Sequence, residues 1–330
     1  MNTTSTSFQS VLDALLSDRK EFPRRYLQEF SDIGALELKT FLDVWPQVKP
    51  GRKLTLLEEL DALAETDTLV SFDDVARALL TDPEPDVRTR AIRLLDEYED
   101  PKVVPSYLDM LKNDPDINVR VEAANALHLF VDLGELEEIP ENIYHQVEDA
   151  LLASAASEDN VRVRRVALES LGYSSRPEVI TLIESAFHRA DPAWQASALT
   201  AMGRSADERW DDEVTRSLVH VDDRIRKAAV EAAGELSLQS ARPILLKMLG
   251  EEEDSSILSA VIWSLSQIGG EDVRSYLENL LDVVEDDDEQ IAFLEEALDN
   301  LAFTEDLERF DLLAFDPDDE LTELDEDEDK

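Results

Sequence analysis

Apolar residues recur along most of the chain at positions i, i+3, i+4 and i+7, which is the spacing of one face of an α-helix. No stretch alternates apolar and polar residues for long enough to indicate a β-strand. Only nine glycines occur in the 330 residues, so few positions invite a break in the helical pattern. The pattern therefore predicts an all-α protein.

The helical pattern itself repeats along the sequence. Successive copies are 31 or 32 residues apart, with one longer interval of 44. The repeats are marked by one apolar residue each, here called the anchor: Val87, Val119, Val163, Trp194, Ile225 and Ile257. Four residues after each anchor stands alanine or valine, and eight residues after it stands leucine, methionine or alanine. A fixed period of this length indicates an array of stacked supersecondary units.

The positions around each anchor predict how its helix is built. Positions 0, +4, +7 and +8 lie within about 100° of one another on a helix, so they form one buried face. Position +7 is mostly alanine or serine, which lets a neighbouring helix approach closely. Three residues before each anchor an Asp, Asn or Glu predicts the helix N-cap. At +9, Gly172, Gly203 and Gly234 predict C-caps in the left-handed conformation.

A second helix follows each anchor helix, so every repeat is a helical hairpin whose apolar face is buried only against its neighbours. We expect an α-α superhelix, a solenoid of antiparallel hairpins, over residues 52–303, with capping helices in residues 1–51. The interval of 44 predicts a protruding loop at about residues 132–142. Residues 304–330 are expected to form an acidic disordered tail with a short apolar segment at 307–315, and helices are expected to end near Phe303.

The residues around the anchors resemble those of HEAT repeats. Asp-Val-Arg at 86–88 and Asn-Val-Arg at 118–120 are each followed by alanine at the +4 position, and Trp-Ser-Leu-Ser-Gln-Ile-Gly at 263–269 is similar to the end of a repeat. The resemblance is to the short bacterial form, also found in phycobilin lyase subunits, and it covers roughly residues 50–300. It implies a HEAT-like fold and says little about function, because HEAT arrays serve many roles.

Composition narrows the classes of partner. The 77 acidic and 31 basic residues give a formal net charge of −46, which disfavours nucleic acid and anionic membranes. Cysteine is absent, which removes disulfides and thiolate chemistry. We find no apolar run of membrane-spanning length and no secretory signal in the first ten residues. A cytoplasmic protein is expected.

Candidate catalytic chemistry is sparse. The four histidines, His128, His145, His188 and His220, are not spaced with acids as metal ligands are, and none is followed by glutamate as in the iron-binding dipeptides of HEAT-like hydroxylases. HEAT-like DNA glycosylases need a cationic surface, whereas this chain is acidic. We found no nucleophile elbow and no phosphate loop. No catalytic residue, metal or cofactor is therefore expected.

Two groups of residues are candidates for partner binding. The first faces away from the buried positions of the anchor helices, mainly at +6, and consists of Arg93, Asn125, His128, Glu169, Thr200, Glu231 and Trp263. The second lies just after two consecutive anchor helices and consists of Tyr173, Ser174, Arg176, Arg204, Ser205, Arg209 and Trp210. We expect the second group to form a basic and aromatic patch at one edge of the solenoid, although turn chemistry also accounts for these residues.

The sequence favours a non-enzymatic scaffold that presents an acidic surface to a protein or peptide with a basic surface. A bilin-lyase-like enzyme or enzyme subunit that holds a small ligand in the groove is the alternative, and it rests on the family resemblance alone. A third interpretation is that the negative charge is an adaptation to high internal salt. The excess of arginine over lysine, 22 against nine, gives this weak support.

Overall fold

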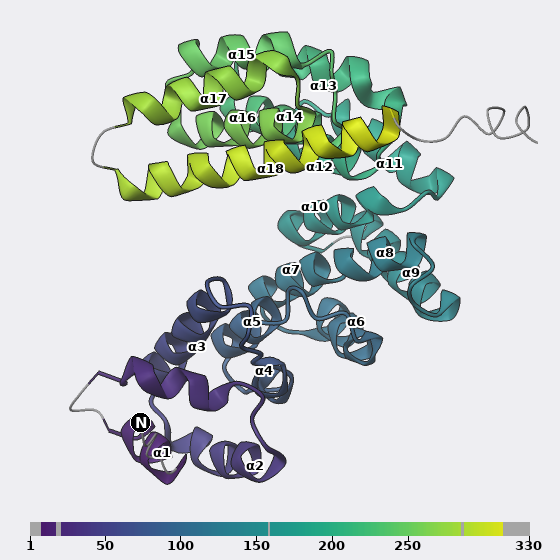
Figure 1. The fold of residues 1–330 in the computed structure, drawn as a ribbon. Coiled ribbons are helices and arrows are strands. Elements are labelled where there is room, and N and C mark those ends of the chain that lie inside the picture. The colour runs from purple at the N-terminus through teal and green to yellow at the C-terminus, as the bar shows by residue number, and fades with distance from the viewer. Residues whose placement is uncertain (1–7, 18–20, 158, 285–286, 313–330) are drawn as a thin grey trace, which may run out of the picture. The chain divides into compact units, whose positions relative to one another are not determined.

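The computed structural model describes residues 8–17, 21–157, 159–284 and 287–312. Within these ranges the chain forms eighteen α-helices and five short 3-10 segments, without any strand, so the all-α prediction is confirmed (Figure 1). The chain divides into two compact units, Met1–Leu182 and Ile183–Lys330, and the division falls inside helix α11 (Pro177–Phe187).

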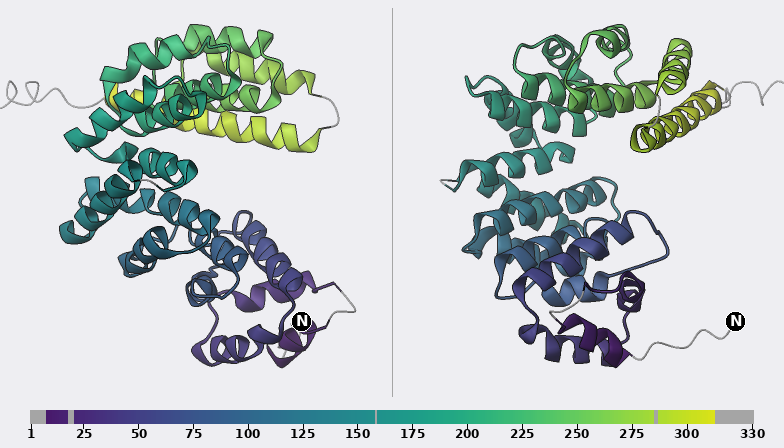
Figure 2. Two further views of the ribbon diagram at one scale, coloured as in Figure 1. Left: turned by 180° about the vertical axis from the view of Figure 1, so that it is seen from behind. Right: turned by 90° about the vertical axis from the view of Figure 1, so that its left-hand side faces the viewer.

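The first unit stacks its helices in two layers (Figure 2). Its helices are α1 (Phe8–Leu15), α2 (Ala35–Val44), α3 (Pro50–Ala64), α4 (Asp73–Leu79), α5 (Pro85–Arg93), α6 (Val104–Asn113), α7 (Ile117–Ala126), α8 (His128–Glu135), α9 (Glu141–Ala156) and α10 (Val161–Ser170). Helices α3, α5, α7 and α10 pack on one another in series, and α4, α6 and α9 pack on that series from outside. The first layer contains the anchor helices.

The second unit repeats this plan. Its helices are α12 (Pro192–Arg204), α13 (Asp211–Ser217), α14 (Asp223–Glu235), α15 (Arg242–Glu251), α16 (Ser255–Ile268), α17 (Glu271–Val283) and α18 (Asp288–Leu312). Helices α12, α14, α16 and α18 pack in series, while α13, α15 and α17 cover α14, α16 and α18 respectively. Each unit is therefore a stack of helical hairpins, as the repeat pattern predicts.

The predicted end of the helices was wrong. Helix α18 continues past Phe303 to Leu312, and the residues just after Phe303 bond to earlier helices. The Thr304 hydroxyl donates to the Ser266 carbonyl oxygen at 3.0 Å, and Arg274 pairs with Glu305 at 2.8 Å. Part of the expected tail and of its apolar segment is thus helical backbone, and residues 313–330 lie outside the described residues.

The buried face of the anchor helices is confirmed. All six anchors are at most 6% exposed, with Trp194 the most exposed of them. The small residues at +7 are buried as well, and the Ser264 hydroxyl donates to the Val230 carbonyl oxygen across α14 and α16 at 2.8 Å. Apolar burial along this face is the main stabilising term of the stack, because every hairpin covers the next.

Polar groups fix the starts of the anchor helices. Asp116, Asn160, Asp191, Asp222 and Asp254 each accept backbone N–H bonds as N-caps, as predicted. An arginine at +1 then reaches an acid just before the next N-cap in three repeats: Arg88 bonds Asp114, Arg120 bonds Asp159, and Arg226 bonds Glu252, at 2.7–3.2 Å. These contacts make the arginines part of the scaffold.

The predicted left-handed glycine caps at +9 were wrong. Helices α12 and α14 continue through Gly203 and Gly234, and the only described glycines with positive φ are Gly269 and Gly270. Glycine is required for close packing instead. A Cβ on Gly203 would lie 2.9 Å from Ala232 Cα, and one on Gly234 would lie 2.8 Å from Ser264 Cα.

The predicted loop at residues 132–142 was also wrong in its extent. Residues 132–135 of this segment belong to helix α8, which packs on α9, residues 141–142 begin α9, and only residues 136–140 lie between the two helices. Phe130, Val131 and Leu133 of α8 are at most 6% exposed. Because these apolar side chains can be buried against the stack, the segment folds as a helix despite Gly134.

Candidate partner-binding grooves

The first unit contains a groove of about 610 Å³, here called the first-unit groove. Helices α3, α5 and α7 form its sides, together with the segment that leads into α4. Its charged lining consists of Asp61, Glu65, Asp73, Asp96, Glu97, Glu122 and Arg93. Two of the predicted +6 residues, Arg93 and Asn125, lie in this groove.

Negative charge dominates the first-unit groove, since six carboxylates line it with one guanidinium. Arg93 forms an ion pair with Glu122, and this bond raises the pKa of Arg93. Burial raises the pKa of Asp61, and the neighbouring Glu65 raises it further. Both effects make ionisation of Asp61 less favourable than that of a carboxyl group in water, while Arg93 and Arg90 oppose them.

The second unit contains a groove of about 520 Å³, here called the second-unit groove. The +6 residues Thr200, Glu231 and Trp263 stand on α12, α14 and α16 and all line it. The residues at +10 form a parallel row, which consists of Arg204, Glu235 and Gln267. The structure thus brings together four of the predicted residues: Thr200, Arg204, Glu231 and Trp263.

Two aromatic rings form the apolar part of the second-unit groove. Trp263 of α16 is half-buried and lies beside Phe293 of α18, with ring centroids 6.5 Å apart and planes tilted by 31°. The other three tryptophans, Trp45, Trp194 and Trp210, are at most 6% exposed. Trp263 therefore combines packing on α18 with a ring surface that lines the groove.

The carboxylates of the second-unit groove stand one helical turn apart on α14. The pKa of Glu235 is raised to about 7, mainly by desolvation, and Glu231 adds to this while Arg204 opposes it. Desolvation also raises the pKa of Glu231, against the effect of Lys227 at 3.7 Å. Both side chains are open to solvent, but they lie in a concavity whose walls displace much of their hydration.

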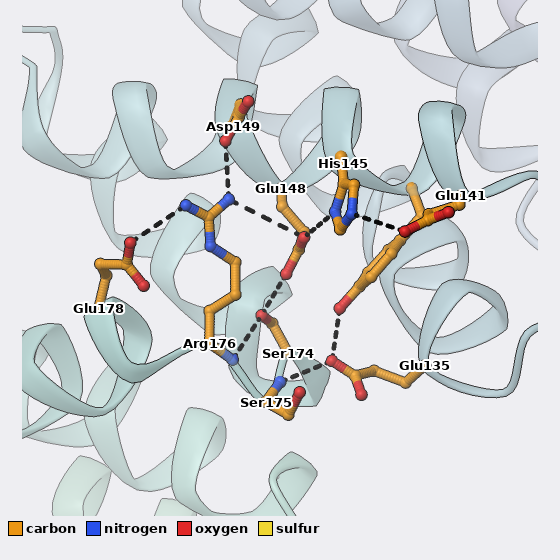
Figure 3. Close-up of polar contacts among 10 residues, drawn as sticks. Glu135, Glu141, His145, Glu148, Asp149, Ser174, Ser175, Arg176 and Glu178 are labelled. Atoms are coloured by element: carbon orange, nitrogen blue, oxygen red, sulfur yellow. Dashed lines mark hydrogen bonds and ion pairs between the residues drawn. The ribbon is translucent and has the colours of Figure 1, made fainter.

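Ser174 and Arg176 belong to a polar cluster around the buried Glu148 of α9 (Figure 3). The Ser174 hydroxyl donates to Glu148 Oε1 at 2.6 Å, and Ser174 is only 5% exposed. Arg176 pairs with Asp149 at 2.7 Å and with Glu178 at 3.2 Å, and it lies 3.9 Å from Glu148. Arg176 is therefore surrounded by acids.

The same cluster fixes the chain around Ser175 on its other side (Figure 3). Glu135 accepts hydrogen bonds from the Ser175 backbone N–H, at 2.6 Å, and from the Tyr144 hydroxyl, at 2.5 Å. His145 donates to Glu148 at 3.0 Å, which raises the pKa of His145. These bonds join α8, α9 and the segment after α10. Around Ser174 and Arg176, where the sequence predicts a basic patch, the structure therefore has an acidic cluster that holds helices together.

Three further candidates lie elsewhere in the first unit: His128, Tyr173 and Glu169. The rings of His128 and Tyr173 stack with centroids 6.0 Å apart, and His128 Nδ1 donates to the Asn125 carbonyl oxygen at 2.6 Å. Glu169 is half-buried on α10. None of His128, Tyr173 and Glu169 lines the first-unit groove.

The remaining candidates lie in the second unit, around the 3-10 turn Glu208–Trp210. Trp210 is 5% exposed, so its expected role in an exposed aromatic patch was wrong. Arg209 is exposed and pairs with Asp207 at 2.6 Å, while the Ser205 hydroxyl donates to the Met202 carbonyl oxygen at 2.7 Å. Turn chemistry accounts for Ser205 and Arg209.

Four residues of these sites were not predicted from the sequence. Lys227, Glu235 and Phe293 line the second-unit groove, and Glu148 lies at the centre of the polar cluster. The first two stand at +2 and +10 on α14, so extending the +6 column by one turn in each direction would have found them. The roles of Phe293 and Glu148 depend on contacts between helices, for which the sequence gives no signal.

In the part of the chain that the structure describes, no three His, Asp or Glu side chains are placed to hold a metal ion. The helices of that part are also too short or too polar to cross a membrane.

Comparison with known proteins identifies the repeats. Residues 73–140 and 214–299 match the family model of HEAT repeats. No curated protein matches the chain. Among solved structures, the complex of CpcE and CpcF of phycocyanin lyase from Nostoc sp. PCC7120 is 18% identical over 69% of this chain and 94% of that chain, with a TM-score of 0.47.

Two other solved structures are also similar to this chain. Human deoxyhypusine hydroxylase is 15% identical over 79% of this chain and 95% of that chain, with a TM-score of 0.33. Kap121p, in a structure bound to Ste12p, is 15% identical over 91% of this chain and 38% of that chain, with a TM-score of 0.43. Because these TM-scores lie below 0.5, the neighbours' activities say nothing about this chain.

The period of the anchors, the stacked hairpins of each unit and the family match all agree. Residues 73–140 and 214–299 of this protein are HEAT repeats.

Proposed function

We propose that the protein is a non-enzymatic cytoplasmic scaffold that binds a protein or peptide with a basic surface, and that the first-unit groove is its main binding surface. The observation that carries the proposal is the lining of that groove, in which six carboxylates stand with one guanidinium. Nucleic acids and anionic membranes would be repelled by the same charge.

A cationic partner would relieve an unfavourable arrangement in the first-unit groove. The pKa of Asp61 is raised by desolvation and by Glu65 and Asp96, so the ionised carboxylate is held in a poor environment. Arg93 offsets part of this charge but is paired with Glu122. A lysine or arginine from a partner would bring a positive charge to the remaining carboxylates without rearranging the fold.

The net charge of −46 supports the proposal at longer range. A field of this sign attracts basic proteins before contact and raises their association rate, and added salt screens it within about 10 Å. Binding should therefore weaken strongly as salt rises.

The test is a titration of the whole protein with a fluorescent lysine-rich peptide and with a glutamate-rich peptide of equal length, at low and high salt. We expect only the lysine-rich peptide to bind, with lower affinity at high salt. The double variant Asp61→Asn with Asp96→Asn should bind at least about tenfold more weakly, since two carboxylates of the groove are lost.

The control removes the same number of charges from exposed positions of the same unit, Asp43→Asn with Glu138→Gln. If the control weakens binding as much as the groove variant, net charge rather than the groove recognises the peptide. Lack of binding of the lysine-rich peptide at low salt would overturn the proposed function.

A further inference from the structure

We propose that the second-unit groove binds a single lysine side chain of the partner, held between the ring of Trp263 and the carboxylates of Glu231 and Glu235. This inference rests on the proposed function and names a second contact for the same basic partner. It follows from the groups that the groove brings together and from an internal example of the same chemistry.

The internal example is Lys53 of α3. Its Nζ lies 5.1 Å from the ring centroid of Trp45, 2.8 Å from Glu84 Oε1 and 3.6 Å from Asp82 Oδ2. Lys53 and Trp45 are 3% and 4% exposed. One indole and two carboxylates therefore suffice in this protein to hold a lysine out of water, as cation–π attraction and ion pairing predict.

One indole and two carboxylates also line the second-unit groove, together with Arg204 and Lys227, neither of which is buried. The indole comes from α16, the two carboxylates come from adjacent turns of α14, and Phe293 closes the apolar end. The groove is about 520 Å³ in volume, which is ample for a lysine side chain and part of its backbone. Thr200 and Gln267 add polar groups on either side.

Lys227 is the internal competitor for this position. Its ammonium group lies 3.7 Å from Glu231, and its side chain is 42% exposed, so the pair is weak and easily exchanged. Arg204 stands beside Glu235 on the neighbouring helix and weakens the field of that carboxylate. The cation of a partner therefore competes with Lys227 for Glu231. Whether a Lys227 substitution raises or lowers the affinity for the partner tests this arrangement.

Tryptophan fluorescence can follow binding directly. Trp263 is half-buried, whereas the other three tryptophans are at most 6% exposed, so a ligand in the groove changes mainly the emission of Trp263. The titration uses a short glycine-serine peptide with one lysine, and the same peptide with that lysine acetylated. We expect a saturable change with the first peptide, and at least about tenfold weaker binding of the second, since acetylation removes the charge.

Three variants separate the groove from general charge effects. Trp263→Leu should abolish the fluorescence change, and Glu235→Gln should weaken binding by about tenfold, while Lys227→Gln should strengthen it. Glu253→Gln is the matched control, because it removes one exposed carboxylate from the same unit outside the groove. Circular dichroism melting confirms that each variant is folded.

The outcomes distinguish this inference from the proposed function. Equal binding of the lysine peptide to wild type, Glu235→Gln and Glu253→Gln would overturn the inference, as would equal binding of the acetylated peptide or weaker binding by Lys227→Gln. If the lysine-rich peptide of the earlier test still binds in these cases, the proposed function stands. If neither peptide binds, both are overturned.

Discussion

Carboxylates at the helix starts and carboxylates in the grooves differ in the direction in which the fold shifts their pKa. Beside an arginine at a helix start, the pKa of the acid is lowered, as in Asp159, Asp222 and Glu252. In the grooves, desolvation raises the pKa of the acid, as in Asp61, Glu231 and Glu235. The fold stabilises the ionised form of the first set and destabilises that of the second.

This difference distinguishes acids that are bonded within the fold from acids whose charge is not fully compensated by it. A carboxylate that bonds an arginine and the backbone N–H groups of the next helix contributes to stability and offers little to a ligand. A groove carboxylate lowers stability when ionised, and such groups are common at binding sites because a ligand supplies the missing counter-charge. Counting acids in the sequence cannot separate the two sets.

The largest expected effect comes from breaking a pair at a helix start. Arg226→Ala should lower the free energy of unfolding by about 2–3 kcal/mol, because Glu252 and the His220 carbonyl oxygen would lose charge-assisted hydrogen bonds. Chemical denaturation measures the change. Arg209→Ala, which removes an exposed local pair, should change it by less than about 0.5 kcal/mol. Equal effects would mean that the helix-start pairs have no special role.

The second-unit groove lies on helices α12, α14 and α16, whose close packing requires glycine. Gly234→Ala should destabilise the protein by about 1–2 kcal/mol, because the new Cβ would lie 2.8 Å from Ser264 Cα. Gly250→Ala on α15 has no atom within 4 Å and should stabilise it by about 0.5–1 kcal/mol through helix propensity. Melting temperatures should move in opposite directions, and a shift of the same sign in both variants would contradict close packing at Gly234.

A smaller effect tests the groove carboxylates. The pKa of Glu235 is about 7 in the folded protein against an ordinary 4.5, so the folded state holds the proton more tightly than the unfolded chain. Stability is therefore lost as the pH rises between about 4.5 and 7 and Glu235 ionises. Glu235→Gln should raise Tm at about pH 8 and leave it unchanged at about pH 4. A lower Tm at pH 8 would show that ionised Glu235 supports the fold.

The smallest effect concerns salt in the absence of a partner. Apolar burial along the anchor faces stabilises each unit regardless of ionic strength, so the protein should stay folded when potassium chloride is removed. Added salt should raise Tm only slightly, by screening the repulsion among the acids. Loss of helical circular dichroism at low salt would instead favour adaptation to a salty interior and weaken the case for partner binding.

Much of the fold could be predicted because it depends on local period. The anchors and their +4 and +8 partners are buried because a helix returns to the same face every three or four residues. The N-cap acids could be predicted because capping needs only a short oxygen-bearing side chain at a fixed place. Several of the residues predicted at +6 also line the two grooves.

The rest depends on contacts that local period does not show. The second-unit groove follows positions +6 and +10, at about 240° and 280° around the helix, and the +10 position was not predicted. Neighbouring helices thus place the groove on the flank of the anchor helix. Burial of Trp210 and the helical form of α8 likewise depend on which surfaces happen to meet.

Close packing at Gly203 and Gly234 also bears on how such a protein can diverge. At both positions an added Cβ would lie less than 3 Å from the backbone of the next repeat. A mutation that adds one methyl group there would push those repeats apart and widen the opening beside Trp263. Single substitutions at glycines behind the groove would then change the size of the ligand that the groove accepts. Every residue that lines the groove would stay the same.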